Sequence, residues 1–186
     1  MRKLVAFEQM SLDGYFVDGN SDMSWAHKQD PEWSEFASCN TSGGGALVFG
    51  RVTYDMMAGF WPTAAAREML PAVAEGMNSM PKLVFSRTMS TPSWQNTTLV
   101  KGDPATEMRK LKSCSGPDMA ILGSGSIVSQ LAQAGLIDEF QIVVNPIVLG
   151  EGRTLFEGVK ERIGLSLVRS RVFGNGNVVL YYERAA

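Results

Sequence analysis

Six short apolar runs, each of strand length, alternate along this chain with segments of helical periodicity. The runs cover residues 3–9, 46–50, 82–86, 97–100, 119–122 and 140–145. Several are apolar at nearly every position, as expected of a strand that is covered on both faces. Strands that alternate with helices in this way are typical of crossover units, so the pattern predicts an α/β fold with a mainly parallel sheet.

The segments between the runs carry helix start and stop signals. Asp30-Pro31 and Asp103-Pro104 each combine an acidic N-cap with a proline at the first helical position. A third helix is predicted from Ser126 to Ala134, and it stops at Gly135.

The end of the chain changes character. Residues 165–173 and 178–183 are strand-like runs joined by Gly-Asn-Gly-Asn, which predicts an antiparallel hairpin. No linker or low-complexity tract interrupts the sequence, and 186 residues suffice for one core. Residues 1–186 are therefore interpreted as one domain.

Charge and composition exclude several classes of function. Lys and Arg number 17 against 19 Asp and Glu, so a net charge of −2 offers no basic surface for nucleic acid or an anionic membrane. Cys39 and Cys114 are far apart and His27 is the sole histidine, so we expect no metal site. Glu8 and Gln9 interrupt the first apolar run, and no run reaches transmembrane length. We therefore expect a soluble, cytoplasmic protein.

The strongest local feature is a glycine turn between a strand and a helix. Gly123, Ser124, Gly125 and Ser126 follow the apolar run 119–122, and Ile127 begins the apolar face of the helix. Backbone N–H groups and the positive end of the helix would converge there, where a pyrophosphate can bind. The third glycine of G-x-G-x-x-G is absent, which disfavours a standard dinucleotide-binding fold. The segment alone is equally consistent with a tight connection capped by Ser126.

Two further strand ends carry groups suited to phosphate. Gly50, Arg51 and Thr53 follow the run 46–50, while Ser86 and Arg87 close the run 82–86. Open α/β sheets bind ligands at the carboxyl ends of their strands. Two arginines near a nucleotide favour NADP, with its extra 2′-phosphate, over NAD.

The long segment after the first strand is interpreted as a binding loop. It contains Asp13-Gly14, which is also a common turn pair, and Trp25, which is suited to a core or pocket wall. Asp30 is the carboxylate best placed to face a pocket, although its N-cap role accounts for it fully.

Taken together, these motifs and residues 146–152, which read Pro-Ile-Val-Leu-Gly-Glu-Gly, resemble the dihydrofolate reductase-like superfamily. The resemblance is to the C-terminal reductase domain of bifunctional riboflavin-biosynthesis deaminase/reductases, and it covers nearly the whole chain. It implies a three-layer α/β/α fold, NADPH lying across the strand ends, and commonly a homodimer.

Carried over by position, the resemblance implies a role for each motif. Gly50, Arg51 and Thr53 resemble the contacts to the cofactor phosphates, Ser86 and Arg87 the edge near the 2′-phosphate, and residues 123–127 the pyrophosphate turn. Trp25 and Asp30 are similar to the tryptophan and the acidic residue of the family's substrate pocket. Asp13, in the motif of residues 11–14, is expected to line the same pocket. The zinc motif of the deaminase half is missing, which leaves a reductase.

Three hypotheses follow. The first is an NADPH-dependent reductase of 5-amino-6-(5-phosphoribosylamino)uracil or a related heterocycle, the second a dihydrofolate reductase, and the third a nucleotide-binding protein without catalysis. Asp30 would assist protonation beside the atom that receives hydride.

Overall fold

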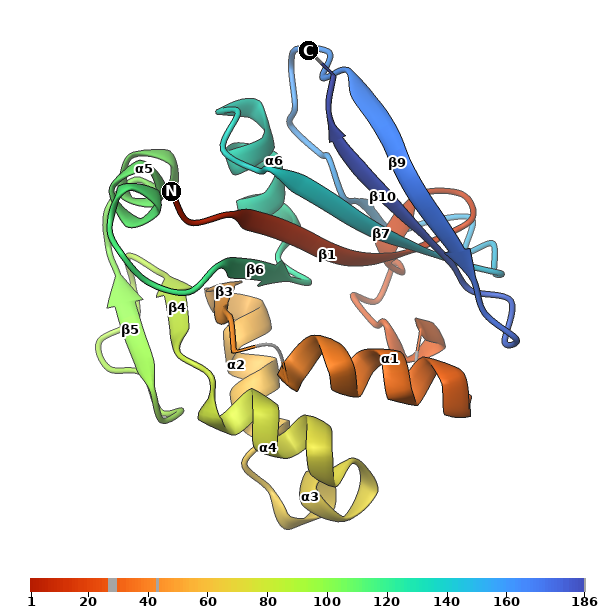
Figure 1. The fold of residues 1–186 in the computed structure, drawn as a ribbon, viewed down its shortest axis with the longest axis horizontal. Helices are drawn as coiled ribbons and strands as arrows, with labels where there is room; N and C mark the ends of the chain where they lie inside the picture. Colours follow the sequence, from red (N-terminus) through yellow and green to blue (C-terminus); the bar gives the residue numbers. More distant parts are fainter. Residues whose placement is uncertain (27–29, 43, 186) are drawn as a thin grey trace.

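The computed structural model describes residues 1–26, 30–42 and 44–185. Its centre is an eight-stranded sheet with the order β5-β4-β3-β6-β1-β7-β10-β9 (Figure 1). The strands from β5 to β7 are parallel, whereas β10 runs antiparallel to both neighbours. The bounds are β1 (Leu4–Ser11), β3 (Ala46–Gly50), β4 (Lys82–Phe85), β5 (Thr97–Val100), β6 (Met119–Leu122), β7 (Glu139–Asn145), β9 (Leu165–Val172) and β10 (Val178–Arg184).

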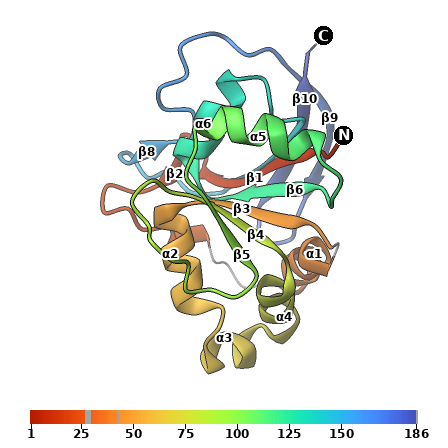
Figure 2. The ribbon, with the colours of Figure 1, turned by 90° about the vertical axis from the view of Figure 1, so that its left-hand side faces the viewer.

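Helices cover both faces of the sheet, which confirms the three-layer α/β/α prediction (Figure 2). One face carries α5 (Pro104–Ser113) and α6 (Gly125–Gln133). The other carries α1 (Pro31–Ser42), α2 (Arg51–Phe60), α3 (Ala64–Met69) and α4 (Pro71–Ser79). The prolines that begin α1, α4 and α5 stand where a helix needs no N–H donor.

Alternation along each central strand explains why the core is divided between the two faces. Val48 and Ile121 pack with α6, while Leu47 and Phe49 pack with α2 and α4 on the opposite side. A smaller cluster centred on Phe36 joins α1 to β7 and β10. Successive strand residues point to opposite faces, so a strand covered on both faces must be apolar at every position.

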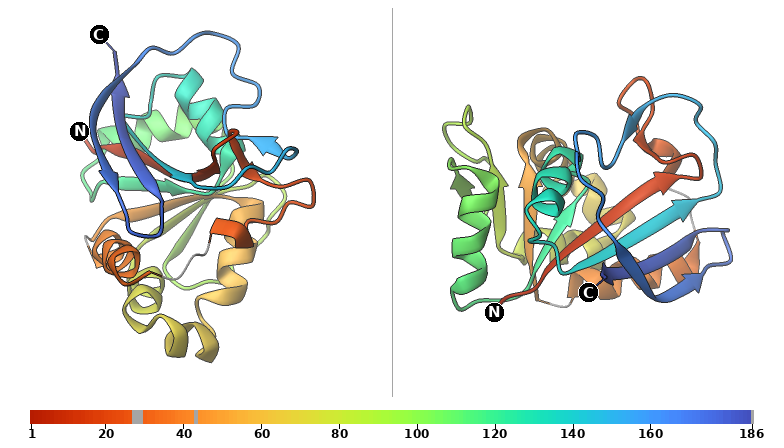
Figure 3. Two further views of the ribbon diagram at one scale, coloured as in Figure 1. Left: turned by 90° about the vertical axis from the view of Figure 1, so that its right-hand side faces the viewer. Right: turned by 90° about the horizontal axis from the view of Figure 1, so that it is seen from above.

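The C-terminal hairpin prediction is confirmed, and β9 forms one edge of the sheet (Figure 3). All eight residues of β9 are exposed. The helix start at Asp30 is also confirmed, because its Oδ1 accepts the N–H of Trp33 at 2.8 Å. Asp103 caps α5 in the same way, accepting the N–H of Thr106 at 2.9 Å.

The structure corrects two predictions. The segment after β1 is not simply a long loop, because β2 (Tyr15–Val17) pairs with β8 (Arg153–Thr154), and a single 3-10 turn follows at Ser24–Ala26. The third helix begins at Gly125, so Ser126 is not its N-cap. His27 lies outside the described residues. Within the described ranges, no helix is long and apolar enough to cross a membrane.

Candidate functional site

The carboxyl ends of three neighbouring parallel strands bring most of the predicted site residues to one edge of the sheet. In the order β4-β3-β6, the chain leaves the sheet at Ser86, Gly50 and Gly123. These residues are distant in sequence and become neighbours only through the crossover topology. This edge is where open α/β sheets bind ligands.

Two hydrogen bonds lock the turn after β6 to the start of α2. The N–H of Gly50 donates to Ser124 Oγ over 2.9 Å, and Thr53 Oγ1 donates to the carbonyl of Gly123 over 2.7 Å. Gly123 has a φ of 55°, in the left-handed region that favours glycine. The turn is therefore held in one shape before any ligand arrives.

The N-terminus of α6 keeps unused hydrogen-bond donors at this turn. The N–H groups of Ile127 and Val128 both donate to the carbonyl of Ser124. The N–H groups of Gly125 and Ser126 have no acceptor among the described residues. Ser124 holds the N-cap position, but its side chain makes no capping bond because its Oγ serves Gly50. Free donors at the positive end of a helix favour an anion.

Phe16 of β2 covers one side of the turn, and sequence patterns gave no signal for it. A Cβ placed on Gly125 would stand 2.7 Å from a carbon of the Phe16 ring, so any larger residue there requires the ring or the turn to move. The guanidinium carbon of Arg153, on the paired strand β8, lies 5.6 Å from the centre of the same ring. The short β2–β8 pair thus brings an aromatic wall and a cation to the turn.

A polar pocket of about 320 Å³ lies at the first turn of α2, and its lining begins at Arg51, the residue after Gly50. Arg51 lines this pocket at the first position of α2 and forms an ion pair of 3.2 Å with Asp55. Both side chains are half exposed, so this pair contributes little stability and can exchange partners. The remaining lining is mostly hydroxyl-bearing, from Tyr54, Thr88, Ser90, Thr91 and Ser93, together with Met89.

Ser86 and Arg87 have different roles in the structure, although they are adjacent in sequence. Ser86 Oγ accepts the N–H groups of Thr88 (3.3 Å) and Met89 (3.0 Å), and it therefore shapes the loop that forms one pocket wall. Arg87 is exposed and does not line the pocket; its charge helps lower the pKa of Asp103, whose main stabilisation comes from Thr106. The predicted strand-end pair is thus split between a loop-shaping hydroxyl and a more distant cation.

Glu8 of β1 is buried under the turn. The feature of the sequence that could have indicated a special role for Glu8 is its charge within an apolar strand. It is 1% exposed, and neither carboxyl oxygen has a hydrogen-bond partner of normal geometry among the described residues. Burial raises the pKa of Glu8 well above its usual range, and the nearby N–H groups of Ser124 and Gly123 oppose this only in part. The raised pKa favours the neutral form of this acid below the candidate anion site.

The other predicted residues, Asp13, Trp25 and Asp30, all belong to the segment between β1 and α1. The carboxylate of Asp13 accepts the N–H groups of Leu149 (3.1 Å) and Gly150 (2.8 Å), which fastens residues 146–152 to the end of β1. Hydrogen bonds from the Ser11 side chain and from Gly150 lower the pKa of Asp13 to about 2. Trp25 donates its indole N–H to the carbonyl of Asp22 over 3.1 Å. Asp30 caps α1, and its Oδ2 faces the hairpin turn at Gly174.

This arrangement agrees with a family comparison. The model of the RibD C-terminal domain matches residues 2–179. The chain belongs to this family. Proteins that are similar to this chain over nearly its whole length include two of Bacillus subtilis (strain 168). YyaP is 29% identical over 98% of this chain and 95% of its own length, and YwjB is 26% identical over 99% of both; both are described as uncharacterized.

Solved structures support the same fold for this RibD C-terminal domain. A putative riboflavin biosynthesis protein from Shewanella sp. PV-4 is 26% identical, with a TM-score of 0.77 and 99% of both chains covered. A deaminase/5-amino-6-(5-phosphoribosylamino)uracil reductase from Thermotoga maritima shares the fold at 14% identity and a TM-score of 0.69. The match covers 99% of this chain and 57% of the Thermotoga chain.

Proposed function

We propose that this chain is an NADPH-dependent reductase of the riboflavin-biosynthesis type. The observation that carries the proposal is the rigid turn between β6 and α6, with free N–H groups beside a pocket that contains Arg51. The family match and the name of the Thermotoga relative support the reaction class. The substrate we propose is 5-amino-6-(5-phosphoribosylamino)uracil or a related nitrogen heterocycle.

The residues present fit such a cofactor. The N–H groups of Gly125 and Ser126 would hold the pyrophosphate, and Arg51 would bind the 2′-phosphate by exchanging Asp55 for it. Bound NADPH supplies the hydride. The protein's part is to bind and orient both reactants, and Asp30 would donate the proton to the atom beside the reduced carbon. We place the substrate near Asp30, Trp25 and Asp13.

The reaction itself is tested by following NADPH absorbance with the pyrimidine substrate and, separately, with dihydrofolate. Turnover of the pyrimidine supports the proposal, whereas turnover of dihydrofolate alone would replace it. No turnover of either, with NADPH still bound, would favour a nucleotide-binding protein without catalysis. Binding of neither NADPH nor NADH would overturn the cofactor assignment as well.

Arg51→Ala is expected to lower NADPH affinity by roughly tenfold or more, because a hydrogen bond between charged groups contributes about 1.5–3 kcal/mol. NADH affinity should change little, since NADH has no 2′-phosphate. Titration by NADPH fluorescence measures both. Arg67→Ala is the matched control, because Arg67 is an exposed helical arginine of α3, away from the pocket. Equal losses for NADPH and NADH would contradict the assigned contact.

Asp30→Asn is expected to lower turnover by about two orders of magnitude while leaving the melting temperature nearly unchanged. Asparagine caps helices as well as aspartate does, so the bond to the N–H of Trp33 is kept and only the proton donor is lost. Asp30→Ala should lose both activity and about 1 kcal/mol of stability. If Asp30→Asn keeps full turnover, the carboxylate serves only as a cap.

We further propose that the protein forms a homodimer through β9. This edge strand is exposed along its whole length and carries Leu167, Val168 and Val172 in exposed positions. An apolar edge without cover invites pairing with another chain. We expect analytical ultracentrifugation to show a dimer, which Leu167→Glu weakens at least tenfold. A monomer at about 100 μM would exclude this interface.

A further inference from the structure

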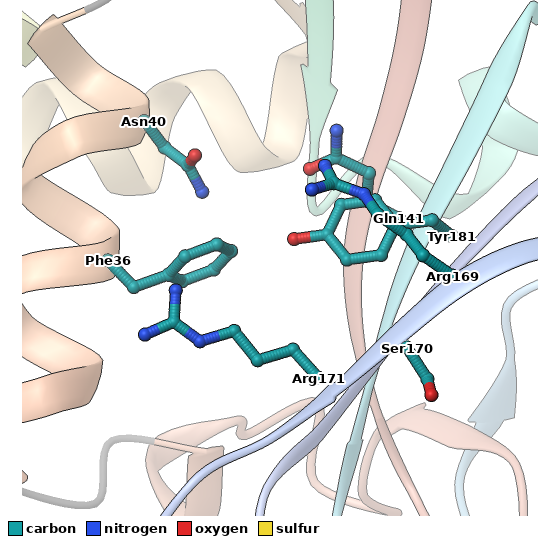
Figure 4. A pocket seen from close by; sticks show the side chains of 7 residues that line it. All are labelled: Phe36, Asn40, Gln141, Arg169, Ser170, Arg171 and Tyr181. Carbon is teal, nitrogen blue, oxygen red and sulfur yellow. The ribbon is translucent and has the colours of Figure 1, made fainter.

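A second pocket lies far from the candidate cofactor site, on the α1 side of the sheet. It has a volume of about 430 Å³, within the range of small-molecule sites. Figure 4 shows that its walls come from four elements, α1, β7, β9 and β10. Its lining includes Phe36, Asn40, Gln141, Arg169, Arg171 and Tyr181. Gln141 stands four residues before the carboxyl end of β7, and none of the residues that line this pocket lines the pocket beside Arg51.

Tyr181 supplies the pocket with an accessible polar group. The residue is 4% exposed, yet its hydroxyl points into the pocket (Figure 4). No residue in the described part of the chain forms a hydrogen bond with this hydroxyl. A tyrosine hydroxyl can both donate and accept a hydrogen bond, so it is available to a ligand in the pocket. Burial raises the pKa of Tyr181, so the hydroxyl stays neutral and is available as a donor.

Arg169 is the cation that the pocket leaves uncompensated. Its guanidinium carbon lies 3.7 Å from the centre of the Tyr181 ring, and no carboxylate of the described residues lies within ion-pair distance of it. The guanidinium thus lies over an aromatic ring, and its N–H groups form no ion pair with a carboxylate of the described residues. Such stacking fixes the plane of the donors without consuming them.

Two carboxylates near the pocket, those of Glu32 and Glu139, have hydrogen-bond partners. Glu32 forms an ion pair of 2.9 Å with Arg171, and Arg171 in turn lies over the Phe173 ring. Glu139 accepts a hydrogen bond of 2.7 Å from Gln141. The hydrogen bond from Arg171 to Glu32 raises the pKa of Arg171, and the negative charge of Glu35 adds a smaller contribution in the same direction. The lining of the pocket itself therefore carries two guanidinium groups and a tyrosine hydroxyl but no carboxylate of the described residues.

We propose that this pocket binds a small organic anion with a flat ring, and that Arg169 and Tyr181 bind its carboxylate or phosphate. The planar fork of an arginine matches the two oxygens of either group. The Phe36 ring would pack against the apolar part of the ligand, and the Asn40 amide lies across the pocket from Tyr181 as a second polar contact (Figure 4). The site does not depend on the proposed reductase activity.

The test uses three probes of similar shape: benzoate, phenyl phosphate and the neutral benzamide. In an NMR titration of the full chain, we expect at least one anion to bind with a Kd in the range of roughly 1 mM, whereas benzamide binds at least tenfold more weakly. The side-chain amide signals of Asn40 and Gln141 should shift, while the backbone signals of Gly125 and Ser126 should not. Comparing the two anions distinguishes a carboxylate from a phosphate ligand.

Two variants locate the contact. Arg169→Ala should weaken anion binding at least tenfold, and Tyr181→Phe should weaken it several-fold while keeping the ring that packs against Arg169. Arg162→Ala is the matched control, since Arg162 is an exposed arginine away from the pocket. NADPH binding should be the same in all three. Anion binding that persists unchanged in Arg169→Ala, or shifts confined to the turn at residues 123–126, would overturn the proposal.

Discussion

Replacing Gly125 by alanine is expected to lower NADPH affinity by more than tenfold and to destabilise the protein. The new methyl group would lie 2.7 Å and 2.9 Å from carbons of the buried Phe16 ring, so the ring or the first turn of α6 must move. Either shift displaces the N–H groups of Gly125 and Ser126, the donors that we assign to the pyrophosphate. Anion contacts of this kind tolerate little displacement, since hydrogen bonds weaken steeply with distance and angle.

The sign of the stability change follows from two opposed effects. Alanine is a better helix former than glycine by about 1 kcal/mol, and the φ of Gly125 is not in the left-handed region. Overpacking a buried contact costs about 1–3 kcal/mol, and here the neighbour is an aromatic ring with little freedom to turn aside. We therefore expect a net loss of stability, measured by urea unfolding.

Gly59→Ala is the matched control for this prediction. Gly59 also lies in a helix, and a Cβ there would meet nothing within 4 Å, so the substitution should leave stability unchanged or raise it. The double variant Phe16→Leu with Gly125→Ala should recover part of the lost stability, because the smaller side chain makes room. A folded Gly125→Ala protein with unaltered NADPH affinity would show that the cofactor does not bind at this turn.

Much of the fold could be predicted because local pattern and tertiary structure agree. The strands at Ala46–Gly50, Thr97–Val100 and Met119–Leu122 have boundaries that match the predicted runs residue for residue. The pair β2 and β8 could not be predicted, because strands of three and two residues are too short to show periodicity. Their pairing depends on contacts between segments that are far apart in sequence.

The site was predictable to the extent that each motif stands at a strand end. The parallel topology places Gly50 beside Gly123 without further information. The error at Ser126 has a physical cause: a serine is an expected N-cap, but Ser124 takes that position, and its hydroxyl is used for a contact to another strand. Phe16 and Arg153 reach the turn through the β2–β8 pair, which no local pattern signals.

Glu8→Gln is expected to stabilise the protein near pH 7.5 and to have no such effect below about pH 4.5, close to the pKa of an unfolded glutamate. Because the folded pKa is raised, the native state binds more protons than the unfolded state above that pH. Its stability therefore falls as pH rises from the unfolded pKa through the folded pKa. A tenfold change in an acid dissociation constant corresponds to about 1.4 kcal/mol, so we expect Gln to raise the melting temperature at pH 7.5 by several degrees.

Glu68→Gln provides the control, because Glu68 is exposed on α3 and takes part in no ion pair among the described residues. The comparison is made below pH 8, because burial lowers the pKa of Lys82 to about 8. Above that pH, Lys82 makes the free energy of unfolding rise with pH, which is opposite to the effect of Glu8. Destabilisation by Glu8→Gln at every pH would mean that Glu8 is ionised and held by the N–H groups of Gly123 and Ser124.

The same substitution connects stability to the cofactor. A carboxylate at Glu8 would place a negative charge beneath the turn that we assign to the pyrophosphate, in a region where little water screens it. The NADPH affinity of the wild-type protein should therefore decline as rising pH ionises Glu8. In the Glu8→Gln protein this decline should be smaller, and the affinity at pH 6 should equal that of the wild-type protein. The neutral acid lets the protein fill the space below the turn with a polar side chain without opposing the anion above it.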